Sequence, residues 1–95
     1  MLMAIQKVRL TPSQVLTKDN IKEILYKARA GSDYCRIDMK MGRYITIAFF
    51  KDNTLDIMTN IWQLSLHNEI QNIRNTRSVT LLADYVFRWI QVYNR

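Results

Sequence analysis

The chain has 95 residues, of which 48% are hydrophobic and 11% aromatic, and it contains two glycines and one proline. Such a composition is typical of one globular domain, here residues 1–95, and excludes a disordered or loop-rich protein. No apolar run approaches the roughly 20 residues of a membrane span, and the apolar start at 1–5 is too short for a signal peptide. We therefore expect a soluble cytoplasmic protein with no membrane partner.

The formal net charge of +6 is concentrated in the first half of the chain. Residues 1–52 hold ten lysines and arginines against five acidic residues, whereas residues 53–95 hold four against three. A clustered basic excess is typical of proteins that bind a polyanion such as DNA or RNA. A charge that serves solubility alone is the competing interpretation.

The chain opens with a predicted edge strand and a predicted helix. Residues 4–10 alternate weakly between apolar and polar side chains, and residues 11–14 favour a short turn. A helix is then predicted at 18–30, with Thr17 as its N-cap and Gly31 as a left-handed C-cap. Its apolar residues fall within an arc of about 100°, and they are Ile21, Ile24, Leu25 and Ala28.

The other faces of this helix are charged. Lys22 and Arg29 lie outside the apolar arc, as do Glu23 and Lys27, which can pair at i,i+4. These faces are therefore either solvated or part of a binding surface.

Three short strands are predicted at 34–41, 44–50 and 55–58. In the first, Cys35, Ile37, Met39 and Met41 alternate with polar residues, and in the second Ile45, Ile47 and Phe49 share one face. Gly42 and residues 51–54 supply the turns. The alternation predicts an antiparallel meander with one apolar face.

A second helix is predicted after the meander, capped by Thr59 or Asn60. Its narrow apolar stripe consists of Trp62, Leu66, Ile70 and Ile73. His67 lies outside this stripe, which predicts an exposed helix histidine.

The last predicted helix, 79–93, is apolar over most of its circumference. Such a helix either is central and packed from several sides or meets another chain. In the second case we expect a homodimer that associates through Phe87, Trp89 and Tyr93. The competing interpretation is that the second helix covers this side within one chain, through Trp62 and Leu66.

The predicted fold class is α+β, ordered (β)-α-β-β-β-α-α, with helices packed on the meander.

Residues typical of catalysis are sparse in this sequence. The single cysteine, Cys35, lies on the apolar strand face, which indicates a core thiol and excludes an internal disulfide. Two isolated glycines cannot form a phosphate-binding loop, and His67 has no partner suited to metal binding or base catalysis. We therefore expect a non-catalytic protein without a metal or cofactor.

One group of residues has the composition of a nucleic-acid interface. The strand face opposite Ile37 and Ile47 interleaves aromatic residues with cations, and it contains Tyr34, Arg36, Lys40, Tyr44 and Phe50. Aromatic and cationic side chains on a flat sheet can stack bases and contact phosphates. We expect Arg36, Lys40, Arg43 and Lys51 to bind, Tyr44 to stack, and Lys22 and Arg29 to contribute from the first helix. This face is alternatively buried beneath the second or third helix.

The predicted function is therefore a nucleic-acid-binding module whose affinity comes mainly from phosphate contacts. The alternative is a small protein-binding inhibitor or accessory factor that docks on an acidic surface of a larger nucleic-acid-handling complex. A composition rich in isoleucine and asparagine would suit a phage or plasmid protein.

Overall fold

The computed structural model describes the backbone of residues 7–10 together with residues 17–74 and 76–94. Its order is β1 (Lys7–Leu10), α1 (Lys18–Ala30), β2 (Tyr34–Asp38), β3 (Tyr44–Phe49), β4 (Leu55–Thr59), α2 (Leu64–Ile73) and α3 (Val79–Tyr93). A short 3-10 turn, η1 (Lys40–Gly42), joins β2 to β3. The predicted α+β fold is confirmed, whereas the predicted turn at 11–14 lies outside the described residues.

The described strands form one sheet in the order β1-β2-β3-β4. The meander is confirmed, because β2 pairs antiparallel with β3, and β3 pairs antiparallel with β4. At the other edge β1 runs parallel to β2, with Lys7 beside Tyr34 and Arg9 beside Arg36 in register. Parallel strands need a crossover connection, and α1 provides it.

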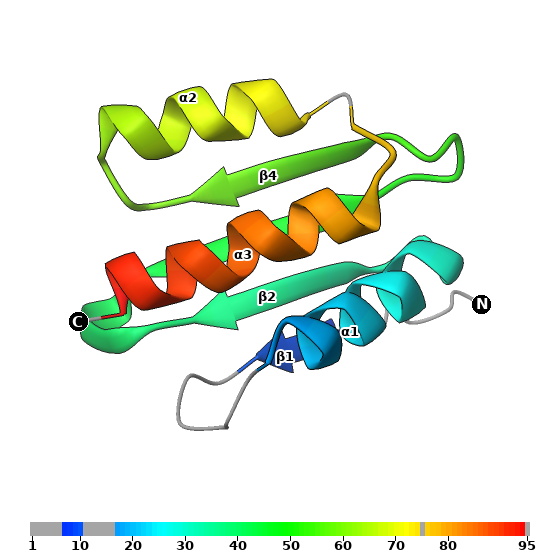
Figure 1. Cartoon of the computed structure of the whole chain (residues 1–95), viewed down its shortest axis with the longest axis horizontal. Coiled ribbons are helices and arrows are strands. Elements are labelled where there is room, and N and C mark those ends of the chain that lie inside the picture. Colours follow the sequence, from blue (N-terminus) through cyan, green and yellow to red (C-terminus); the bar gives the residue numbers. More distant parts are fainter. Residues whose placement is uncertain (1–6, 11–16, 75, 95) are drawn as a thin grey trace.

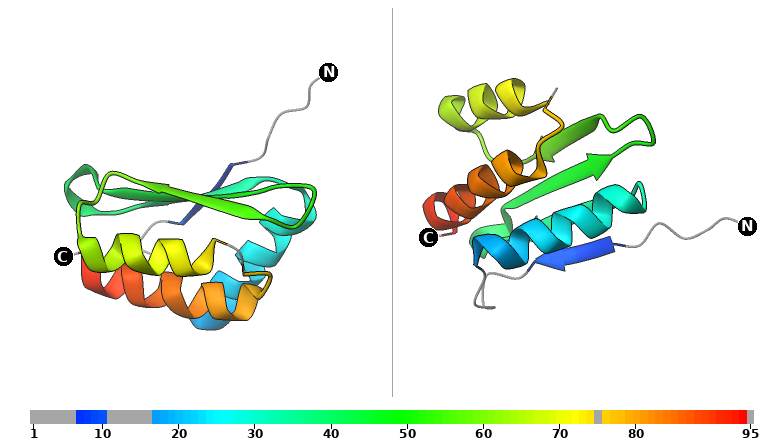
Figure 2. Two further views of the ribbon diagram at one scale, coloured as in Figure 1. Left: turned by 90° about the horizontal axis from the view of Figure 1, so that it is seen from above. Right: turned by 45° about the vertical axis from the view of Figure 1, so that its right-hand side comes forward.

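All three described helices pack on the same face of the sheet, as Figure 2 shows. Helix α3 lies in the middle of this layer, between α1 and α2 (Figure 1). This position explains the wide apolar arc of α3, since its buried residues face the sheet and both neighbouring helices. The central packing predicted as one of two alternatives is therefore the one observed.

The core lies between the sheet and this helical layer. The inward strand residues include Cys35, Ile37, Ile45 and Ile47, each with no exposed surface. The largest buried side chain is Trp89, whose indole Nε1 donates a hydrogen bond of 3.1 Å to Glu69 Oε1. The same carboxylate pairs with Arg88, so α2 and α3 are joined by polar as well as apolar contacts.

The N-cap predicted for α1 is confirmed, whereas the conformation predicted for its C-cap is not. Thr17 is the N-cap as predicted, and its hydroxyl accepts a hydrogen bond from the Asn20 amide. The predicted left-handed Gly31 is wrong, because Gly31 has a φ of −90° and the positive φ falls on Ser32 instead. A Cβ at position 31 would require the Asp33 carboxylate to move, which a flexible side chain can do.

The first strand of the meander ends earlier than predicted. It stops at Asp38, because η1 reverses the chain with Met41 and Gly42 both at positive φ. Met41, placed by alternation on the apolar face, is 85% exposed instead. The second strand ends at Phe49, and the third extends to Thr59.

The start of the second helix was also predicted wrongly. It begins at Leu64, with Gln63 at the N-cap and no side-chain cap. Asn60 bonds to β3 and η1 instead: its Oδ1 accepts from the Tyr44 amide, and its Nδ2 donates to the Gly42 carbonyl. Trp62 precedes the helix and is 89% exposed, while Ile61 takes the buried position. Leu66, Ile70 and Ile73 are buried as predicted.

Two further predictions need correction. His67 is half-buried rather than exposed, and its Nε2 lies 2.9 Å from the Ile61 carbonyl oxygen. Trp89 and Tyr93 are buried in the core of their own chain, so they cannot contact a second copy as predicted. Phe87 is half-buried, with the Lys18 ammonium 5.6 Å from its ring centroid.

Candidate nucleic-acid interface

The face of the sheet opposite the helices is covered by none of the elements that the structure describes (Figure 2). Alternate residues of β2, β3 and β4 lie on it, because successive side chains of a strand point to opposite faces. Here they surround a shallow depression of about 340 Å³, lined by Tyr34, Arg36, Tyr44, Thr46, Ala48 and Met58. This open face, defined by those six residues, is the strongest candidate site, and the alternative that a helix buries it is wrong.

Arg36 is held in place by two partners on this face. Its guanidinium carbon lies 4.3 Å from the centroid of the Tyr44 ring, and its Nε lies 2.8 Å from Asp38 Oδ1. The strand pairing explains this arrangement: Asp38 opposes Tyr44 and Arg36 opposes Thr46, so Arg36 and Tyr44 are diagonal neighbours. The pairing fixes the guanidinium plane and partly neutralises its charge.

The other residues of the open face are small, aromatic or apolar, and Asp56 of β4, which alternates to the same side beside Ala48, is paired with Arg74 at 3.3 Å. Ala48 opposes Tyr34 and Thr46 opposes Met58, so small residues form the floor between larger ones. Met58 is 56% exposed, and Phe50 is exposed just beyond the end of β3. A surface that combines flat rings, a thioether and one paired arginine suits stacking and apolar contact more than it suits strong charge attraction.

Two of the predicted cations lie at one end of the open face. Lys40 and Arg43 belong to η1 and its C-cap, directly before Tyr44. Lys40 is exposed, whereas Arg43 is half-buried and donates from Nη2 to the Met41 sulfur at 3.5 Å. Lys40 and Arg43 therefore lie together at the end of the open face nearest Tyr44, which we call the basic end.

The other predicted cations are not brought to this place. Lys51 lies in the β3–β4 turn, at the far end of β3 from Lys40 and Arg43. Lys22 and Arg29 belong to α1 and hence to the helical layer on the other face. The predicted set is thus divided among three places, and Arg36, Lys40, Arg43 and Tyr44 are the members that lie together.

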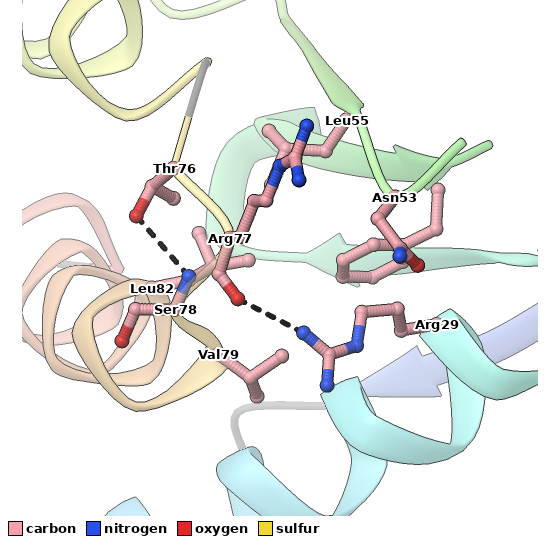
Figure 3. Close-up of a pocket in the computed structure, with 9 residues that line it drawn as sticks. Arg29, Asn53, Leu55, Thr76, Arg77, Ser78, Val79 and Leu82 are labelled. Carbon is pink, nitrogen blue, oxygen red and sulfur yellow. Dashed lines mark hydrogen bonds between the residues drawn. The ribbon is translucent and has the colours of Figure 1, made fainter. Parts of the chain in front are cut away.

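Arg29 takes part in a crevice at the start of α3, shown in Figure 3. Its Nη1 donates a hydrogen bond of 2.9 Å to the Arg77 carbonyl oxygen, and its guanidinium lies 5.1 Å from the Tyr26 ring centroid. The crevice is too narrow to admit a water molecule. Arg29 therefore joins α1 to the connection before α3, and the crevice offers no space for a ligand.

The described part of the chain shows little that would support covalent chemistry. Cys35 lies on the core side of β2, where burial raises the pKa of its thiol to about 12. A thiol with so high a pKa is protonated and unreactive at neutral pH. No group of three or more histidine, cysteine, aspartate or glutamate residues within this part could hold a metal ion.

Met58, Thr46 and Ala48 were missed as members of the site by sequence reasoning. The alternation of β4, with Leu55 and Ile57 inward, places Met58 outward and was available as a signal. Its position beside Thr46 depends on the β3–β4 register, which the turn residues alone do not specify.

Comparison of the chain with protein-family models, with curated protein sequences and with solved structures finds no significant match in any of the three. Among the described residues, no helix is long and apolar enough to cross a membrane.

Proposed function

We propose that this protein binds single-stranded nucleic acid on the open face of its sheet, without catalysing a reaction. The observation that carries the proposal is the stacked Arg36–Tyr44 pair on an uncovered sheet face, beside a depression lined by a second tyrosine. Bases of single strands stack on aromatic rings and on guanidinium planes, and this recognition needs no particular sequence.

The proposed contacts divide between bases and phosphates. The Arg36 guanidinium lies over the Tyr44 ring, and in this proposal a base stacks on the pair. Tyr34, across β3 from Asp56 near the start of β4, provides a second ring that lines the depression. Lys40 and Arg43 would meet the phosphates at the basic end, and the net charge of +6 favours any polyanion at long range.

A single strand fits these contacts better than a duplex does. Stacking requires bases whose faces are accessible, and in a duplex those faces are covered by their neighbours. Arg36 is also paired with Asp38, so its side chain offers a plane more than a free charge. A duplex-binding surface would instead present several unpaired cations along one stripe.

The test is a fluorescence-anisotropy titration of a labelled single strand and of the matching duplex at about 50 mM and about 200 mM salt. We expect the single strand to bind more tightly, with an affinity that falls as salt increases. Replacing Tyr44 by isoleucine keeps strand propensity but removes the ring, and it should weaken binding by roughly 1–3 kcal/mol. Absence of binding at the lower salt concentration would reject the proposal.

The chain contains a matched control for this substitution. Tyr26 on α1 also has an arginine over its ring, Arg29 at 5.1 Å, but it belongs to the helical layer. Tyr26→Leu should therefore leave affinity unchanged. Equal losses for the two variants would place the interface elsewhere.

A protein partner is the second candidate, because Met58 and Phe50 give the same side of the sheet an apolar component. An inhibitor or accessory factor of a nucleic-acid-handling complex would use this face against an apolar surface bordered by carboxylates. In that case Met58→Ser would weaken partner binding, and oligonucleotides would not bind at all.

A further inference from the structure

A second exposed apolar surface lies away from the open face, at the start of α2. Trp62 is 89% exposed and Leu64 is 77% exposed. Large side chains as exposed as these mark interaction surfaces when they occur together. The surface continues along the outer side of α2 through four exposed polar residues, which are Ser65, Asn68, Gln71 and Asn72. We call these six residues the α2 face.

The six residues of the α2 face carry no charge, and Arg74, the C-cap residue whose guanidinium donates to Gln71 Oε1, is paired with Asp56. Residues 57–73 contain one Asp, Glu, Lys or Arg, which is Glu69. Its carboxylate is turned to α3, where it accepts from Trp89 Nε1 and pairs with Arg88. Depletion of charge around exposed aromatic and aliphatic residues is the compositional pattern of the centre of a protein–protein interface.

Trp62 is fixed in this exposed position by its neighbours. Its ring lies 5.2 Å from the His67 ring, centroid to centroid, and His67 is itself hydrogen-bonded to the Ile61 carbonyl. Ile61 is anchored in the core, and Asn60 is bonded to β3 and η1. An anchor held before binding loses less side-chain entropy on association.

We propose that the α2 face binds a second copy of this chain, in a symmetric dimer in which the two α2 helices face each other. Two copies that each carry +6 repel one another wherever their charged surfaces meet, and the α2 face is where they can meet without that repulsion. Asn68 and Asn72 have amide side chains that both donate and accept. Such groups can pair with their own copies across a two-fold axis, which a lysine or glutamate cannot do.

The same lack of charge argues against other occupants. An anionic membrane, a nucleic acid and an acidic protein would each need several cations, whereas residues 57–73 supply none and the adjacent Arg74 is already paired with Asp56. The dimer should be weak. A ten-residue helix is about 15 Å long, and a contact along it buries less than the roughly 1,200–2,000 Å² of a standard interface.

The proposed dimer has a consequence that rests on the proposed function. Helix α2 lies in the helical layer, so association through it leaves the open faces of both copies exposed (Figure 2). Two linked open faces could engage one strand together and bind it more tightly than either does alone.

Sedimentation equilibrium of the whole chain, from micromolar to millimolar concentration, tests the dimer directly. We expect the average mass to rise from that of a monomer towards that of a dimer. Trp62 fluorescence should shift to the blue over the same range, while the buried Trp89 gives a constant background. A chain that stays monomeric at millimolar concentration overturns the proposal.

Two variants locate the interface. Trp62→Ser removes the anchor, and Asn68→Lys puts like charges on both sides of the two-fold contact; each should raise the dissociation constant about tenfold or more. Both positions are exposed, so the fold should persist, and Phe50→Ser at the sheet end is the matched control. Association that ignores both variants, or a blue shift of Trp62 that requires anionic lipid vesicles or oligonucleotide, also overturns the proposal.

Discussion

The Arg36 guanidinium carbon lies 4.3 Å from the centroid of the Tyr44 ring. The two residues come from neighbouring strands, and the antiparallel register of β2 and β3 sets their spacing. The Nε of the same guanidinium lies 2.8 Å from Asp38 Oδ1. A guanidinium held in this way acts as a planar surface, a property that lysine cannot reproduce although it has the same charge.

The variant Arg36→Lys therefore tests whether binding depends on the planar shape of the guanidinium or only on its positive charge. We expect this variant to weaken single-strand binding about tenfold, because the ammonium retains the charge but offers no plane for a base. The dependence of the binding constant on salt should change little, since the number of neutralised phosphates is the same. Anisotropy titrations at several salt concentrations measure both quantities. An unchanged affinity would show that no base stacks on Arg36.

Lys40→Gln, in contrast to Arg36→Lys, should change the salt dependence of binding. Lys40 is exposed at the basic end of the open face and is proposed to meet a phosphate. Its loss should reduce the slope of log affinity against log salt by about 0.7, the value for one single-strand phosphate. The matched control is Lys51→Gln, which removes the same charge from the far end of the sheet. Equal changes in slope for the two variants would contradict a localised interface.

Regular alternation and helical periodicity predicted most of the fold. Thr17 and Ile21 marked α1, and the inward isoleucines of β2 and β3 marked the meander, because such patterns depend on neighbours along the chain. The start of the second helix was predicted wrongly because residues distant in the sequence determine it. Asn60 is a good helix cap by composition, but β3 and η1 offered it two backbone hydrogen bonds instead.

The candidate site was predictable only in part for the same reason. Tyr34, Arg36 and Tyr44 follow from alternation within single strands. Whether a helix covers them depends on which side the connections cross the sheet, and local sequence does not specify that. In the sequence Lys51 and Lys22 carry the same charge as Lys40. The topology nevertheless places Lys51 at the opposite end of the sheet and Lys22 in the helical layer.

Cys35 should be unreactive in the folded protein and should make stability depend on alkaline pH. Burial raises the pKa of its thiol from 9.0 to about 12. Between these values the unfolded chain loses the proton and the folded chain keeps it, so the free energy of unfolding falls as pH rises from 9 towards 12. The maximal slope from this one group is about 1.4 kcal/mol per pH unit.

Urea titrations of the wild type and of Cys35→Ala across this pH range isolate the thiol, since the other titrating groups are common to both. The difference between the two proteins should shrink as pH rises. A thiol reagent at neutral pH should label Cys35 only in denaturant. Rapid labelling of the native protein would contradict the burial of the side chain.

Asn60 should be worth more to stability than its exposure suggests. It is an exposed residue, but its side chain bonds to the Tyr44 amide at 2.9 Å and to the Gly42 carbonyl at 3.0 Å. These two bonds join the end of β4 to the start of β3 and to η1. Asn60→Ala removes both, and we expect a loss of about 1–3 kcal/mol in the free energy of unfolding. Urea denaturation measures it.

Asn72→Ala is the control for this loss, because Asn72 is exposed on the outer side of α2, where alanine has the higher helix propensity. That variant should be neutral or slightly stabilising. Because Asn60 also fixes the segment before Trp62, its replacement should loosen the Trp62 ring from His67. We therefore expect dimerisation to weaken in Asn60→Ala even where the chain remains folded. A variant with wild-type stability would show that water replaces both hydrogen bonds without loss.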